Sequence, residues 1–140
     1  MEPKVMNTAA RLATAAGGVL LLAAPFLPWA ETAGSTTSGW DVASGVCVLL
    51  WITGLTALAA AMTGGRIGFF RPDVSLGGAA DMLGVVSIAV VVWQLFDLPD
   101  GAGAAWGVYS ALGGAVAVMS ACGDYRTLRG APAFPRLGPR

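Results

Sequence analysis

Histidine is absent from the 140-residue sequence, and charged residues are scarce. The absence of His excludes bis-histidine haem, histidine-ligated metals and Ser-His-Asp chemistry. Only 11% of the residues are charged, against about 25% in ordinary soluble domains. The 8 basic residues equal the 8 acidic ones, so a basic nucleic-acid-binding protein is disfavoured. We therefore expect no nucleic-acid partner and no cofactor.

Apolar residues, in contrast, make up 56% of the chain. A transmembrane helix needs about 20 consecutive, mostly apolar residues. Four segments meet this requirement, at about 8–28, 44–62, 76–96 and 103–122. Their connections are short, which favours antiparallel neighbours. The sequence predicts an all-α fold, an integral membrane antiparallel four-helix bundle within residues 1–123.

The two ends of the chain differ in character. The first apolar segment is longer than the 7–15 residues usual for the apolar part of a signal peptide, so we expect it to be retained as a span. Residues 124–140 contain three prolines and four arginines. This composition is typical of a disordered basic tail.

Lysine and arginine are distributed asymmetrically about the four predicted spans. Lys4 precedes the first span and Arg11 lies at its start. Two of the other six, Arg66 and Arg71, lie between the second and third spans, and the remaining four follow the fourth span. The charged residues of the two remaining connections are all acidic, namely Glu31, Asp41, Asp97 and Asp100. Because cytoplasmic loops are enriched in Lys and Arg, we expect a multi-pass plasma-membrane protein with both termini in the cytoplasm.

Aromatic and basic residues at the ends of the spans are expected to anchor the protein at the lipid interface. Tryptophan prefers this level because its ring is apolar while its N–H needs a polar partner. The expected anchors are Trp29, Trp40, Trp93 and Trp106 at the outer ends, and Arg66, Arg71, Arg126 and Arg129 at the inner ends.

Small residues recur along the fourth span. Helices in lipid associate through close packing of small residues rather than through hydrophobic exclusion from water. Four of them follow at four-residue spacing: Gly103, Gly107, Ala111 and Ala115. A second set on another face contains Gly113, Ala117 and Ala121, and the first span offers Ala9, Ala13 and Gly17. The first set is predicted to be a helix-packing seam, and two small faces suit a helix that is contacted from two sides.

Asp81 is the acidic residue within the third span. A charge at the centre of a membrane costs about 2.5–3.5 kcal/mol on insertion scales and often marks a functional site. One hypothesis makes Asp81 a transport or polar site facing the bundle interior. The alternative places it near the cytoplasmic start of its helix, within reach of water, Arg66 or Arg71. We favour the alternative because Asp81 lies only about 8 Å along the helix from Leu76.

The two cysteines fall near opposite ends of their spans. Cys47 lies near the outer end of the second span, and Cys122 near the inner end of the fourth. A disulfide needs Cα atoms within about 7 Å, so these residues are not expected to pair within one chain. The sequence also has no Cys-x-x-Cys motif, which excludes disulfide-exchange enzymes of that type.

The first outer connection carries two short motifs, Phe26-Leu-Pro-Trp29 and Ser38-Gly-Trp-Asp41. In these motifs the chain resembles small four-span membrane proteins of high-GC Gram-positive bacteria. The resemblance implies a plasma-membrane protein and no particular activity.

Two functions are compatible with these features. The first is a non-enzymatic accessory or assembly subunit, which binds lipid and other membrane subunits or copies of itself through the small faces of spans one and four. The second is a small dimeric transporter or channel that uses Asp81. No nucleophile with an adjacent base is visible, so we expect no enzyme.

Overall fold

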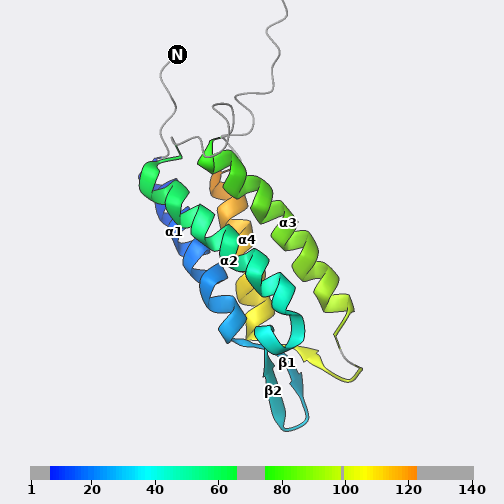
Figure 1. Cartoon of the computed structure of the whole chain (residues 1–140). Helices are drawn as coiled ribbons and strands as arrows, with labels where there is room; N and C mark the ends of the chain where they lie inside the picture. Colours follow the sequence, from blue (N-terminus) through cyan, green and yellow to red (C-terminus); the bar gives the residue numbers. More distant parts are fainter. Residues whose placement is uncertain (1–6, 66–74, 99, 123–140) are drawn as a thin grey trace, which may run out of the picture.

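The computed structural model describes residues 7–65, 75–98 and 100–122, and these residues are mostly helical (Figure 1). The helices are α1 (Thr8–Ala23), α2 (Gly39–Thr63), α3 (Leu76–Phe96) and α4 (Trp106–Cys122), with a 3-10 turn η1 (Ala24–Phe26) after α1. Three short strands also form: β1 (Pro28–Thr32), β2 (Ser35–Ser38) and β3 (Gly103–Ala104). The helical prediction is confirmed, whereas the strands were not predicted.

Within the described part of the chain, three helical segments are long and apolar enough to cross a membrane, namely Thr8–Phe26, α2 and α3. Helix α4 is apolar but has 17 residues in the described part of the chain. Its length is therefore about 26 Å at 1.5 Å per residue, slightly less than the hydrocarbon core of a bilayer. The predicted start of this helix at residue 103 is wrong, because β3 precedes Trp106.

Local sequence explains where the helices begin and end. Asn7 caps α1 by accepting a hydrogen bond from the Ala10 N–H at 2.7 Å, and Ser75 caps α3 through Gly78. Such polar caps satisfy amide groups that have no partner in the first helical turn. Helix α2 ends at Thr63 and is capped by Gly64, whose left-handed conformation (φ 65°) suits glycine.

Helix α2 contains a break near its beginning. Ala43 has non-helical angles (φ −153°, ψ 68°), so the turn at Gly39–Asp41 is offset from the rest of the helix. The hydroxyl of Ser38 donates to the Asp41 carboxylate at 2.6 Å in this first turn. The regular apolar helix therefore starts after Ala43, in agreement with the predicted start of the span at residue 44.

The helices are arranged so that α1 and α3 each pack against both α2 and α4. Figure 1 shows the four helices side by side, with successive helices running in opposite directions. We call the end beside the three strands the sheet end and the end that contains Asn7 the Asn7 end. This arrangement makes α1 and α4 direct neighbours, although they are the first and last helices of the chain.

Adjacent glycines allow α1 to approach two neighbours at once. A Cβ added at Gly17 would lie 2.7 Å from the Gly114 carbonyl oxygen of α4. A Cβ added at Gly18 would lie 3.0 Å from the Gly54 carbonyl oxygen of α2. Neither distance leaves room for a side chain, so the backbones of α1, α2 and α4 are in close contact at this level.

The three strands form a small antiparallel sheet in the order β2-β1-β3 at one end of the helices (Figure 1). Ala30 pairs with Thr37 of β2 and with Ala104 of β3. The polar connection between the first two predicted spans therefore contains a β-hairpin. Strand β3 comes from a distant part of the chain, so the pairing is visible only in three dimensions.

Candidate functional site

Asp81 lies inside the helix assembly and is 2% exposed. It is on α3, on the same side as Gly84, where an added Cβ would lie 3.3 Å from the Ala115 carbonyl oxygen of α4. Its carboxyl group interacts electrostatically with the Cys122 thiol. The side chain is therefore directed towards neighbouring helices rather than along the outer surface.

Cys122 of α4 also contacts a polar side chain of α1. The Cys122 Sγ and Thr14 Oγ1 atoms are 3.6 Å apart, and Thr14 also donates to the Ala10 carbonyl oxygen at 2.8 Å. Both side chains are fully buried. We call Thr14, Asp81 and Cys122 the inner polar cluster. It is the candidate polar site of the protein, and it brings together groups from three helices at the Asn7 end.

A second buried polar contact joins α2 and α3. The hydroxyl oxygens of Thr53 and Ser87 are 2.9 Å apart, and Thr53 also donates to the Leu49 carbonyl oxygen at 2.9 Å. Interhelical hydrogen bonds of this kind contribute about 0.6 kcal/mol each in membrane proteins. This contact therefore helps to align α2 with α3 but offers no group for acid–base chemistry.

The predicted seam on α4 is mostly buried, with one correction. Gly107, Ala111 and Ala115 face the interior, whereas Gly103 is exposed in β3. Gly103 is therefore not part of a helix seam. The buried members lie against other parts of the same chain: Gly107 packs against the Trp29 ring of β1, and the Ala115 carbonyl oxygen faces Gly84 of α3. On this face of α4 the small residues are therefore covered within the chain, and the expectation that small faces bind other subunits concerns the remaining ones.

A close contact between α4 and α1 involves Gly114, which lies outside both predicted stripes. A Cβ added at Gly114 would lie 2.9 Å from the Gly17 carbonyl oxygen and 3.1 Å from Leu20 and Leu21 side-chain atoms. Four-residue spacing did not single out Gly114. The signal that could have found it is the adjacent pair of glycines in each helix, at 17–18 and 113–114.

The four tryptophans expected at the lipid interface have different environments. Trp93 and Trp106 are 73% and 76% exposed, whereas Trp29 is fully buried. The Trp29 Nε1–H donates to the Ala24 carbonyl oxygen at 2.8 Å, and its ring packs against Gly39 and Gly107. The expectation that Trp29 faces lipid is wrong, because its ring and its N–H both find partners within the protein.

Trp40 belongs to a cluster of three aromatic rings. It is half-buried, and its ring centroid lies 6.4 Å from that of Phe26 and 5.8 Å from that of Trp51. The distance between the Phe26 and Trp51 rings is 5.9 Å. These rings connect η1 to α2 near the sheet end. The basic anchors Arg66, Arg71, Arg126 and Arg129 lie outside the described residues.

Both cysteines are free, in agreement with the expectation that they do not pair, and both are buried. In the described ranges 7–65, 75–98 and 100–122, no group of three or more Cys, Asp or Glu side chains could hold a metal ion. No protein-family model, curated protein or solved structure matches the chain. The chemistry of the described residues is therefore the basis for any functional inference.

Proposed function

We propose that the protein is a small, non-enzymatic, multi-pass protein of the bacterial plasma membrane that acts as an accessory or assembly subunit of a larger membrane complex. In this proposal the four helices cross the bilayer as an antiparallel bundle, with both termini in the cytoplasm. The three long apolar helical segments support membrane insertion, and the one-sided distribution of Lys and Arg supports the orientation. The two motifs of the first outer connection support a relationship to small four-span proteins of high-GC Gram-positive bacteria.

The proposal that the protein binds a partner rests on the outward face of α4. The exposed residues of this helix recur at alternating spacings of three and four residues, which places them on one side. They are Trp106, Tyr109, Gly113, Val116 and Ser120. A Cβ added at Gly113 would meet no atom within 4 Å, so no contact inside the protein requires this glycine.

Glycine in a helix costs about 1 kcal/mol relative to alanine. On a face that contacts only lipid, nothing offsets this cost. A neighbouring helix could approach the backbone closely at Gly113, since small residues favour contacts between membrane helices. Gly45 of α2 is also open, but it lies two residues after the break at Ala43, which gives it a local structural role.

Substitution of Gly113 by Leu tests this contact. We expect G113L to reduce recovery of the bound subunit, or of a second copy, at least about fivefold in mild detergent, which corresponds to the 1–2 kcal/mol of a membrane-helix contact. Recovery is measured by affinity purification and quantitative mass spectrometry. The matched control is G45L, which places the same side chain at another open helical glycine. A monomeric wild-type protein, or equal losses with both variants, would contradict the proposal.

A second candidate function is a small dimeric transporter or channel, favoured by the near-complete burial of Asp81 between helices. An ionisable group in this position is expensive within a membrane and commonly marks a path for ions or protons. In this case Asp81→Asn is expected to abolish cation or proton flux into vesicles containing the purified protein. Asp41→Asn, which changes an exposed acid in the first turn of α2, serves as the control. Flux that survives D81N would eliminate this function.

A further inference from the structure

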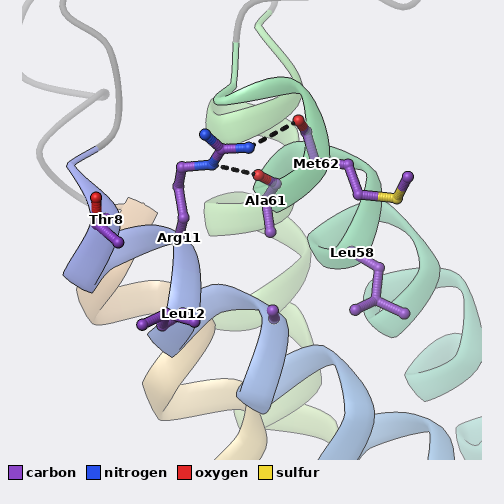
Figure 2. Close-up of a pocket in the computed structure, with 7 residues that line it drawn as sticks. Thr8, Arg11, Leu12, Leu58, Ala61 and Met62 are labelled. Atoms are coloured by element: carbon purple, nitrogen blue, oxygen red, sulfur yellow. Dashed lines mark hydrogen bonds between the residues drawn. The ribbon is translucent and has the colours of Figure 1, made fainter.

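A hollow of about 330 Å³ lies between α1 and α2 at the Asn7 end (Figure 2). Thr8, Arg11, Leu12 and Ala15 line it from α1, and Leu58, Ala61 and Met62 line it from α2. Leu12 and Met62 are largely exposed, so the hollow opens on the outer surface of the helices. Its walls are mainly aliphatic, which suits a hydrocarbon chain rather than a polar solute.

Arg11 bridges the two helices at the rim of this hollow. Its Nε–H donates to the Ala61 carbonyl oxygen at 2.7 Å, and Nη2 donates to the Met62 carbonyl oxygen at 3.0 Å. These carbonyls belong to the last turn of α2, where carbonyl groups have no partner within the helix. Figure 2 shows the third guanidinium nitrogen directed away from both carbonyl oxygens.

The two hydrogen bonds leave Arg11 able to bind an anion. A guanidinium group has five N–H donors, and the described residues accept hydrogen bonds from two of them. Both acceptors are neutral carbonyl oxygens, so they orient the guanidinium without cancelling its charge. An arginine held in this way is well suited to phosphate, which it binds through paired, charge-assisted hydrogen bonds.

We propose that the hollow between α1 and α2 is a binding site for an anionic phospholipid. The headgroup phosphate accepts hydrogen bonds from the Arg11 guanidinium, and an acyl chain lies against Leu12, Ala15 and Leu58. Charge complementarity selects an anionic lipid, and basic sites between membrane helices on the cytoplasmic side bind such headgroups. The inference rests on the proposed membrane topology, which places Arg11 at the cytoplasmic leaflet, and it is independent of the proposed contact at Gly113.

The test measures the melting temperature of the full-length protein in mild detergent with added phosphatidylglycerol, phosphatidylcholine or inorganic phosphate. Phosphatidylglycerol is expected to raise the melting temperature of the wild type more than phosphatidylcholine does. Arg11→Gln is expected to weaken phosphatidylglycerol binding roughly tenfold, the effect of losing a charge-assisted hydrogen bond. Arg140→Gln is the control for general charge, because it removes a basic residue that is not among the expected lipid anchors.

A second variant keeps the test decisive if loss of the Arg11 bridge destabilises the protein. Ala15→Leu retains Arg11 but fills the hollow, and it is expected to reduce phosphatidylglycerol adducts in native mass spectrometry. G113L should bind the lipid like the wild type, which separates this site from the proposed subunit contact. Equal binding of both phospholipids, equal losses with R11Q and R140Q, or full binding by A15L would overturn the proposal. Stabilisation by inorganic phosphate equal to that by phosphatidylglycerol would also overturn it, since no acyl chain would then be required.

Discussion

Substitution of Trp29 by Ala is expected to destabilise the protein by about 3–5 kcal/mol, the usual effect of truncating a buried tryptophan to alanine. The Trp29 ring is fully buried and packs against Gly39 at the start of α2 and Gly107 in the first turn of α4. Its Nε1–H also satisfies the Ala24 carbonyl oxygen after α1. The substitution therefore removes a contact common to three helices and leaves a buried cavity at the sheet end.

The measurement is unfolding of the purified protein in mixed micelles. Unfolding is monitored through the reaction of Cys47 and Cys122 with a maleimide. Both thiols are buried in the folded protein, so their labelling reports unfolding. The control is Trp106→Ala, which truncates a tryptophan that is 76% exposed. We expect W106A to change the free energy of unfolding by less than about 1 kcal/mol. Similar destabilisation by the two variants would contradict the buried role of Trp29.

The second large effect is expected from Gly114→Ala. The added methyl group would meet the Gly17 carbonyl oxygen at 2.9 Å and two leucine side chains of α1 at 3.1 Å. A carbonyl oxygen in a helix moves only with its backbone, so α1 and α4 must separate. Overpacking of this kind costs about 1–3 kcal/mol.

Gly113→Ala provides the matched control for Gly114→Ala, because the two glycines are adjacent in the same helix. Position 113 has no atom within 4 Å of an added Cβ, so G113A is expected to stabilise the isolated protein by up to about 1 kcal/mol. Opposite signs for adjacent substitutions are the expected result, measured by the same labelling assay. If both substitutions stabilise the protein, the close approach of α1 to α4 is incorrect.

These two sites show how the helices are held together without many large core residues. At the sheet end a single tryptophan fills the space between η1, α2 and α4. Towards the middle, Gly17 and Gly18 allow the α1 backbone to contact α4 and α2 directly. Small-residue contacts of this type are those expected where helices associate within lipid.

The helices themselves could be predicted from the sequence. Long uncharged runs separated by Pro, Gly and Asp clusters determine where helices form, because backbone groups in an apolar environment must satisfy one another. The structure places α3 at Leu76–Phe96, the same residues as the predicted third span. The second helix agrees once the break at Ala43 is taken into account.

The candidate site could be predicted only in part. Asp81 was identifiable as the acid in the third apolar run, but the sequence favoured a position near water, and the structure buries it against other helices. Its proximity to Cys122 and the contact of Cys122 with Thr14 join residues more than 40 positions apart. No local pattern encodes such proximity, so the inner polar cluster was not predictable.

By itself, the sequence determined the number and approximate limits of the helices and the uneven distribution of basic residues, since both follow from local hydropathy and charge. Only the tertiary structure decided which small residues form contacts and which tryptophan is buried. Trp29 and Trp106 are the same residue type in similar flanking positions, yet one is enclosed and the other exposed. Gly113 and Gly114 differ in the same way, because α1 packs against the side of α4 that contains Gly114 and leaves Gly113 open.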